Sequence, residues 1–352
     1  MANVLITGGS GYLGGDILSQ LPAAAAELPF HGKIYALVRT AAQADSVRQL
    51  GLEPLAFDAY DAGAVEDNVL RHEISVVFWL VDPFHSTAQL HFIGALTKLK
   101  QKNGGGQVHF LHTSGAKIFS SLVDAPTDRA LYDDEDGLFD VQKKQEQETK
   151  SLIQKAVETN NKIIEASESA GVRSYVFVPC IVYGESRGFG NKISIQTVAI
   201  IKAAKALRRV YKIEEGRPEW PVSHVSDTTA LYLAILRGIL AGDDDAVGHG
   251  KRGYYLASSG PVAWDDIYAS IAKGLHERGL VDDASVELAS EEVVEKMAAA
   301  LQSPKGMVPI QISGKCTLTA SHGHKLGWKP VYPPQHILET ADEEVELVLK
   351  HI

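Results

Sequence analysis

Short apolar runs alternate with longer segments of helical periodicity over the first half of the chain. Strands that are enclosed on both faces read as nearly continuous apolar runs, so these runs predict buried strands. The segments between them place apolar residues three and four positions apart, which is typical of helices that cover a sheet. The first three runs lie at residues 3–7, 33–40 and 55–61. The alternation continues to about residue 180 and predicts an α/β fold with a doubly wound parallel sheet.

A glycine-rich segment follows the first predicted strand. The stretch LITGGSGYLGG, residues 5–15, leads from that strand into a segment with helical spacing. Strand, glycine turn and helix together direct backbone N–H groups and a helix N-terminus at a phosphate. Gly8 permits the tight turn, Gly11 lets the backbone approach a pyrophosphate, and Gly14 lets the helix pack on the strand. This context favours a dinucleotide-binding loop over a glycine turn without a ligand.

Composition and charge narrow the classes of function. Apolar residues make up 45% of the chain and charged residues 22%, as in ordinary soluble proteins. The formal net charge of -10 argues against nucleic acid as a main partner, since phosphate binding needs clustered lysine and arginine. The most apolar run, residues 74–81, is far shorter than the roughly 20 residues of a membrane span, and we find no signal peptide. With two cysteines, we expect a cytoplasmic protein without disulfides or membrane contact.

The segment TGGSGYLG, residues 7–14, resembles the T-G-x-x-G-x-x-G fingerprint of the extended short-chain dehydrogenases/reductases. That family includes sugar-nucleotide epimerases and dihydroflavonol reductases. Other landmarks of the family recur in order along almost the whole chain, at residues 74–81, 108–115, 176–184, 220–236 and 326–330. The resemblance implies a Rossmann-type fold that binds NAD or NADP. It also implies that the cofactor contacts come from Thr7, Gly8, Gly11, Tyr12, Leu13, Gly14, Leu80, Val81 and Pro179.

The chain is predicted to divide near residue 184, where the strand–helix alternation breaks. Helical periodicity dominates afterwards, with helices predicted at 193–210, 262–279 and 290–302. We expect a dinucleotide-binding Rossmann domain over residues 1–184, with its sheet completed by segments near 221–236 and 253–259. The resemblance implies that residues 185–352 form mainly a smaller, mostly helical C-terminal lobe that binds the substrate.

The end of the second predicted strand bears on which dinucleotide binds, because adenosine-ribose discrimination happens there. Arg39 stands at this point, and no carboxylate occurs from residue 33 to residue 44. A guanidinium can hold a 2′-phosphate bidentately, so we predict NADP, with NAD as the alternative and a solvated surface arginine as the plainer interpretation. By resemblance, Asp58 with Ala59 would contact the adenine. Asp61 is better interpreted as the cap of the next helix.

The sequence lacks the Tyr–Lys pair through which most members of this family move a proton. In Y-x-x-x-K, the ammonium lowers the tyrosine pKa, and the tyrosine exchanges a proton with the substrate oxygen. None of the twelve tyrosines is followed by lysine four residues later. The helix that should carry the pair is predicted at 148–171, where Lys155 either bonds the nicotinamide ribose or faces solvent. Ser114, at the end of the fifth predicted strand, occupies the family's Ser/Thr position beside the substrate oxygen.

Other side chains could supply the missing proton. His85 follows the fourth predicted strand and so opens at the carboxyl edge of the sheet, where histidine can act as an acid or a base, although a loop histidine is the simpler interpretation. Tyr183 ends the segment 176–184 and would face the substrate by analogy. Tyr132 lies in an acidic segment, 124–140, that reads more simply as a solvated loop.

Several remaining features are interpreted as structural. His224 and Asp227 fall in this class, and Asp227 is placed to cap a helix that begins at Thr228. Residues 321–325, SHGHK, hold two histidines without a third ligand at suitable spacing, so we predict no metal site. No G-x-S-x-G segment occurs, which sets aside a serine hydrolase.

Three functions are consistent with these patterns. The first is an NADP-dependent oxidoreductase that acts on a small carbonyl or alcohol with a proton donor other than a Tyr–Lys pair. The second is an enzyme without net redox chemistry, such as an epimerase, a dehydratase or an isomerase. The third is a dinucleotide-binding regulator. Ser114 and the aromatic residues of the C-terminal half favour an enclosed site and hence an enzyme. We expect a small-molecule substrate and a monomer or homodimer.

Overall fold

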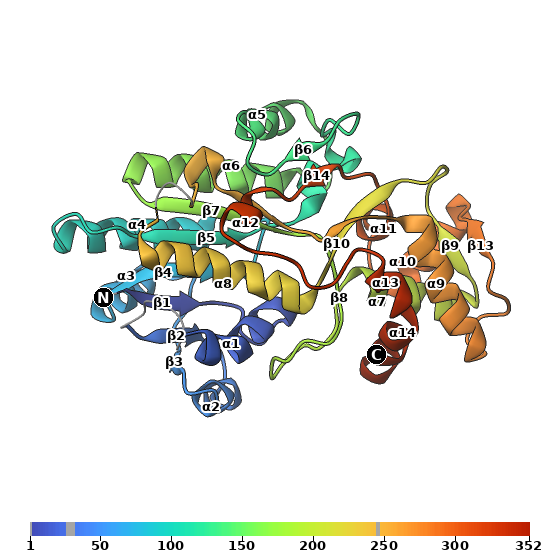
Figure 1. Ribbon diagram of the computed structural model, residues 1–352, viewed down its shortest axis with the longest axis horizontal. Helices are drawn as coiled ribbons and strands as arrows, with labels where there is room; N and C mark the ends of the chain where they lie inside the picture. Colours follow the sequence, from blue (N-terminus) through green and yellow to red (C-terminus); the bar gives the residue numbers. More distant parts are fainter. Residues whose placement is uncertain (1, 26–31, 244–246) are drawn as a thin grey trace.

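A seven-stranded parallel sheet forms the centre of the molecule (Figure 1). The computed structural model describes residues 2–25, 32–243 and 247–352. The strand order is β11-β7-β5-β4-β1-β2-β3, and every neighbouring pair is parallel. This order confirms the predicted doubly wound α/β fold of the Rossmann type. The strands are β1 (Asn3–Ile6), β2 (Ile34–Leu37), β3 (Glu53–Leu55), β4 (Ile74–Trp79), β5 (His109–Thr113), β7 (Arg173–Pro179) and β11 (Tyr254–Ala257).

Helices cover both faces of this sheet. On one face, Val4 and Ile6 of β1 pack with α1 (Tyr12–Ala25) and α8 (Val225–Ala241). Leu5 points to the other face, because successive side chains of a strand alternate. That face is covered by α3 (Ala62–Arg71), α4 (Thr87–Lys102) and α6 (Gln154–Ala170). Because both faces are covered, the central strands are nearly continuous apolar runs, which is the pattern that predicted them.

The C-terminal part is smaller, mostly helical, and lies beside the carboxyl ends of the central strands (Figure 1). Its helices include α7 (Gln196–Leu207), α9 (Trp264–Glu277), α10 (Glu291–Leu301), α11 (Met307–Ile312), α13 (His336–Glu339) and α14 (Ala341–His351). Small sheets join it: β12-β10-β8 (Gly260–Ala263, Glu219–His224, Ile181–Tyr183) and β13-β9 (Val286–Leu288, Val210–Lys212). Within the described parts of the chain, no helix is long and apolar enough to cross a membrane.

A pair of short strands lies at the segment that follows β5. Two small strands pair there, β6 (Leu131–Tyr132) and β14 (Leu318–Thr319). They bring the acidic segment predicted as a loop next to the late part of the chain. The other helices of the molecule are α2 (Ala41–Gln49), which follows β2, α5 (Leu138–Glu148) and α12 (His322–Lys325).

The third strand lies earlier than predicted. It was expected at 55–61, but β3 already ends at Leu55. The residues beyond it form a turn, because the Asp61 N–H donates to the Asp58 carbonyl at 3.2 Å. The Asp61 carboxylate then accepts from the Ala64 N–H at 3.0 Å, which confirms that Asp61 caps the next helix.

The helix predicted at 148–171 is interrupted. Helix α5 ends at Glu148, and Thr149 adopts an extended backbone conformation. The Thr149 hydroxyl donates to the Val123 carbonyl at 3.1 Å, so a buried polar contact outweighs helical propensity here. Helix α6 starts afresh at Gln154. This break changes which residues of α6 face the sheet edge.

The segment near 221–236 adds no strand to the seven-stranded sheet. Its strand, β10, pairs with β8 and β12 in a separate small sheet, and its helix, α8, packs against α1. The segment near 253–259 supplies β11, which is the edge strand next to β7. The boundary between 1–184 and 185–352 stays a prediction.

Asp227 is structural, but it does not cap α8 as predicted. The helix begins before Thr228, and the cap is His224, whose ring nitrogen accepts a backbone N–H. Asp227 therefore lies within the first turn, and its carboxylate accepts the N–H groups of Val331 and Tyr332 at 2.9 and 3.0 Å. These bonds fix the segment that leads to α13.

Candidate active site

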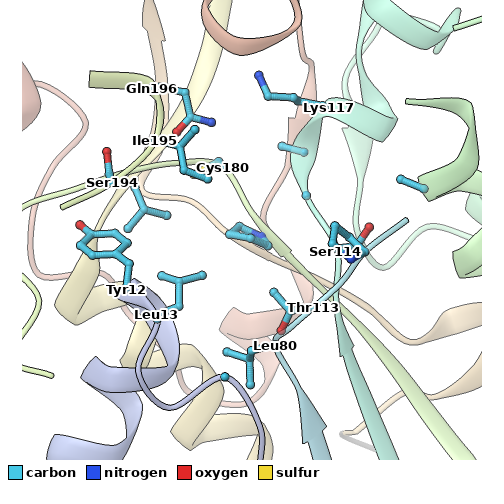
Figure 2. Close-up of a pocket in the computed structure, with 18 of the residues that line it drawn as sticks. Tyr12, Leu13, Leu80, Thr113, Ser114, Lys117, Cys180, Ser194, Ile195 and Gln196 are labelled. Atoms are coloured by element: carbon cyan, nitrogen blue, oxygen red, sulfur yellow. The ribbon is translucent and has the colours of Figure 1, made fainter. Parts of the chain in front are cut away.

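A cavity of about 410 Å³ lies at the carboxyl ends of β1, β4, β5 and β7 (Figure 2). The strand order reverses at β1, which has β2 on one side and β4 on the other. Such a switch point is where open α/β sheets bind ligands. The walls come from the glycine-rich loop, the segments that follow β4, β5 and β7, and the first residues of α6 and α7.

The glycine-rich loop forms the floor of this cavity. Gly8 has φ of +70°, and a Cβ there would lie 2.8 Å from the Leu80 carbonyl oxygen. A Cβ at Gly14 would lie 2.3 Å from the Gly8 carbonyl oxygen, so neither position accepts a side chain. At Gly11 a Cβ would approach only the Gly8 oxygen, at 3.1 Å. Because α1 begins at Tyr12, its N-terminus borders the cavity.

Thr7 joins the ends of β1 and β4 beneath the loop. Its buried hydroxyl donates to the Phe78 carbonyl at 3.3 Å and accepts from the Leu80 N–H at 3.0 Å. Leu80 lines the cavity, whereas Val81 is half exposed and does not. Thr7 therefore shapes the loop and contributes no cavity wall.

Ser114 lines the cavity, and its side-chain hydroxyl is buried and unpaired. Its N–H donates to the Phe177 carbonyl at 2.8 Å, which holds the residue against β7. The buried Oγ has no hydrogen-bond partner among the described residues. The adjacent Thr113 hydroxyl bonds instead to the Tyr232 hydroxyl at 2.8 Å. A buried hydroxyl without a partner is costly, so this atom is a candidate ligand contact.

The loop between β8 and α7 covers the glycine-rich loop from the other side. Tyr12 lines the cavity, and its hydroxyl donates to the Gly184 carbonyl at 2.6 Å, while burial raises its pKa. The Asn191 N–H donates to the Ser10 carbonyl at 2.9 Å, and Asn191 borders the cavity. Leu13 and Pro179 complete this side of the lining. Together these contacts set the width of the cavity above the helix N-terminus.

The three residues expected at the adenosine end lie outside the cavity. Arg39 is exposed directly after β2, and β2 lies next to β1, the strand that leads into the glycine-rich loop. Asp58 is exposed, and its carboxylate accepts the Tyr60 N–H at 2.9 Å. Ala59 is buried beneath this turn. Adenosine-ribose recognition occurs at the end of the second strand in such folds, so these positions are compatible with the predicted contacts.

Lys155 does not line the cavity, and its position fits the solvent-facing one of its two interpretations. It is exposed on α6, whereas its neighbours Ile153 and Ala156 border the cavity. Because helix positions rotate by about 100° per residue, the restart of α6 at Gln154 decides which side chain faces inward. The inward position falls to Ala156, and the lysine points to solvent.

The three alternative proton donors also lie outside the cavity. His85 is exposed, and its ring nitrogen lies 2.8 Å from the Asp82 carboxylate. Tyr132 is about half exposed on β6. Tyr183 is buried, but its hydroxyl lies 3.1 Å from the His336 ring nitrogen, toward the C-terminal part. Strand side chains alternate, so Val182 faces the cavity and Tyr183 faces away from it.

Lys117 lines the cavity, although no sequence pattern predicted it there. It lies three residues after Ser114, in the short 3₁₀ turn Ala116–Phe119, which carries the chain away from β5. A lysine placed so soon after a strand that ends at the sheet edge was the available signal. Burial lowers the pKa of Lys117 to about 7. The residue as a whole is partly exposed.

The cavity residues are compatible with a bound dinucleotide. Gly8 and Gly14 let the loop backbone pack closely, and the space beside Gly11 is open where the loop meets the N-terminus of α1. Ser114, whose buried hydroxyl is unpaired, lines the same cavity. No cluster of three or more metal-ligating side chains occurs among the residues whose positions are described.

Comparison with known proteins identifies the family. A model of the NAD dependent epimerase/dehydratase family matches residues 4–247. The oxidase ucsJ of an Acremonium species is 22% identical over 343 residues, which covers 94% of this chain and 93% of that protein.

Solved structures share the fold along the full length. The UDP-glucose 4-epimerase of Thermotoga maritima, determined with UDP-glucose, has a TM-score of 0.61 at 15% identity and covers 99% of both chains. A dTDP-glucose 4,6-dehydratase of Bacillus anthracis, in complex with NAD, has a TM-score of 0.63 at 13% identity and covers 100% of this chain and 97% of its own. Since the family model matches well over half of the chain, the protein is an enzyme that belongs to the NAD-dependent epimerase/dehydratase family.

Proposed function

We propose that the protein is an NADP-dependent oxidoreductase that acts on a small carbonyl or alcohol. The observation that carries this proposal is that one cavity joins the glycine-rich loop to the orphaned hydroxyl of Ser114. A hydroxyl left unpaired at the carboxyl edge of the sheet is poised to bond a substrate oxygen. Membership of an enzyme family leaves no reason to propose the regulator.

The glycine-rich loop and the N-terminus of α1 would hold the cofactor pyrophosphate. Gly8, Gly11 and Gly14 leave the space, and Tyr12 and Leu13 flank it. When bound, the cofactor supplies or accepts a hydride.

The remaining cofactor contacts are those that the family resemblance implies. Arg39 would pair with the 2′-phosphate through its guanidinium, and Asp58 with Ala59 would border the adenine. Leu80, with Val81 next to it, and Pro179 would border the nicotinamide end, in line with the placement of Leu80 and Pro179 at the cavity wall.

Ser114 would hold the substrate oxygen while the apolar wall excludes water. Phe84, Ile195 and Trp220 form much of that wall. Tyr12 is a poor proton donor, because its hydroxyl is already committed to the Gly184 carbonyl. Because the sequence has no Tyr–Lys pair, the proton would come from a water molecule that the Ser114 hydroxyl holds and that exchanges with solvent.

Reduction of a panel of small aldehydes and ketones by NADPH tests this proposal. Ser114→Ala should lower kcat about a hundredfold, as for removal of one positioned donor, while KM changes little. His85→Ala and Tyr132→Phe should keep full activity, since both side chains lie outside the cavity. Full activity of Ser114→Ala would show that this hydroxyl does not hold the substrate oxygen.

A second candidate is an epimerase, dehydratase or isomerase on the same site. The absence of the Tyr–Lys pair, through which most members of the family move a proton in redox chemistry, favours it. Product analysis by NMR, without a net change in cofactor absorbance, would identify this chemistry. A wild-type protein that binds NADPH but reduces no carbonyl in the panel would favour this candidate over the oxidoreductase.

A further inference from the structure

Lys117 is the one charged side chain among the described residues that line the cavity. Figure 2 shows its side chain extending across one end of the cavity, with Leu80 and Thr113 toward the opposite end of the view. The rest of the lining is apolar or uncharged. A cation in this setting calls for an explanation that the cofactor does not supply, because the pyrophosphate cradle lies at the glycine-rich loop.

The contacts of the Lys117 ammonium leave one donor unused. Its Nζ donates to the carbonyl of Ile310 and, at 3.1 Å, to the carbonyl of Gln311, both on α11. The Trp220 ring centroid lies 5.3 Å from Nζ, which adds a cation–π contact. An ammonium has three N–H donors, so the third has no acceptor within the described parts of the chain.

No carboxylate of the described chain pairs with Lys117. Carbonyl groups and an aromatic face stabilise a cation but do not neutralise its charge. Burial is the main cause that lowers the pKa of Lys117 to about 7. The titratable group that acts on it is the Cys316 thiol, and burial raises the pKa of that thiol to about 12, so it stays neutral. Cys180, which also lines the cavity, has its pKa raised by burial as well. A negative charge at this point would have to come from a ligand.

The number of cations limits the kind of anion. Phosphate and diphosphate groups carry more than one negative charge and are usually held by arginine forks or several cations. Among the described lining residues, Lys117 has no second lysine or arginine beside it. One buried ammonium next to apolar walls matches a single carboxylate.

We propose that Lys117 binds a carboxylate of the substrate, and that the substrate is a small monocarboxylic acid carrying the reactive carbonyl or alcohol, not a nucleotide sugar. This inference rests on the proposed function in taking the cavity as the substrate site. The third N–H of Lys117 donates to the carboxylate, and the Trp220 face packs against the adjoining apolar part of the ligand.

Calorimetric titration with a matched pair of probes tests this assignment. The probes are 3-phenylpropanoate and 3-phenylpropanamide, added to the wild-type protein with and without saturating NADPH. The carboxylate should bind about tenfold to a hundredfold more tightly than the amide, as expected for a charge-assisted bond. At pH 7, repeating the titration in buffers of different ionisation enthalpy should show net proton uptake, because burial lowers the pKa of the free lysine to about 7 and the bound carboxylate favours the charged form.

Three variants assign the effect to Lys117. Lys117→Met should abolish both the carboxylate preference and the proton uptake. Lys117→Arg should keep a preference but take up no proton, because a guanidinium is always charged. Lys202→Met, an exposed position on α7, is the matched control and should behave as wild type. Thermal unfolding of each variant reports folding, and the wild-type proton uptake stands without any variant.

Equal binding of the two probes, or binding of neither, would overturn the assignment. A preference that survives Lys117→Met would also overturn it, as would proton uptake without a carboxylate preference. Failure of the proposed function looks different, since absent NADPH binding or absent turnover would leave the carboxylate preference in place.

Discussion

The glycines of the first loop have two different roles at the residue scale. Gly8 and Gly14 are closed to any side chain, because a Cβ would lie 2.8 and 2.3 Å, respectively, from a backbone carbonyl oxygen. Gly11 is different, because a Cβ would meet only the Gly8 oxygen at 3.1 Å and the remaining space opens to the cavity. A side chain at Gly11 would therefore occupy space proposed for the pyrophosphate and leave the loop itself largely intact.

Gly11→Val should abolish dinucleotide binding while unfolding stays cooperative. Calorimetric titration with NADPH measures the binding, and urea unfolding followed by circular dichroism measures the fold. Gly94→Ala is the control, since a Cβ at that helical position meets no atom within 4 Å. Normal cofactor binding by Gly11→Val would mean that this glycine is a turn residue without a ligand.

At the scale of elements, a buried carboxylate ties three segments together near the candidate site. Asp16 of α1 accepts from the Arg187 N–H at 2.8 Å, the Thr229 hydroxyl at 2.7 Å and the Gln20 amide at 2.6 Å. These bonds join α1, the loop between β8 and α7, and α8. The loop that covers the glycine-rich loop is therefore held by the same helix whose N-terminus borders the cavity.

Asp16→Ala should lower the free energy of unfolding by about 1–3 kcal/mol, because it leaves the buried Thr229 hydroxyl and the Arg187 N–H without their acceptor. It should also weaken NADPH binding by loosening the covering loop. Gln20→Ala removes a single donor from the same carboxylate and should cost much less. An unfolding free energy of Asp16→Ala equal to that of wild type, measured in urea, would show that these bonds contribute nothing net.

The elements also show what periodicity can and cannot predict. Apolar runs predicted the central strands because both faces of the sheet are covered. The break between α5 and α6 was hidden, since it depends on a bond from Thr149 to Val123, which is distant in sequence. Lys155 and Tyr183 lie next to residues that line the cavity but do not line it themselves. A shift of one residue along a helix or strand turns the side chain to another face, and the sequence pattern does not fix the position that closely. Lys117 was overlooked because the family resemblance assigns no role to that position.

At the scale of the whole molecule, buried histidines make stability depend on pH. His112 lies in β5, and burial lowers its pKa to about 3, while in the unfolded chain it is about 6.5. Between pH ~6.5 and ~3, His112 binds a proton in the unfolded chain but stays unprotonated in the folded protein. The stability that His112 contributes by staying neutral is therefore fully present above pH ~6.5 and is lost as the pH falls toward ~3. Burial also lowers the pKa of His224, to about 4, with the same sign.

His112→Leu should remove part of this acid sensitivity. Between pH 7 and pH 5, one such histidine costs about 2 kcal/mol of unfolding free energy, and the variant should lose correspondingly less than wild type. Both His112 ring nitrogens lack hydrogen-bond partners in the described structure, so the apolar replacement should be tolerated at pH 7. Urea unfolding of both proteins at pH 7 and pH 5 measures the change. If variant and wild type lose the same free energy of unfolding between the two pH values, the acid sensitivity belongs to other groups.

Titration of the wild-type protein and of Arg39→Ala with NADPH and with NADH tests the proposed cofactor most directly. Arg39 is exposed at the end of β2, where its guanidinium can meet a 2′-phosphate. NADPH should bind wild type about tenfold to a hundredfold more tightly than NADH, and Arg39→Ala should remove most of that difference. Equal affinity of the wild-type protein for the two cofactors, or a preference for NADH that survives Arg39→Ala, would contradict an NADP-dependent site.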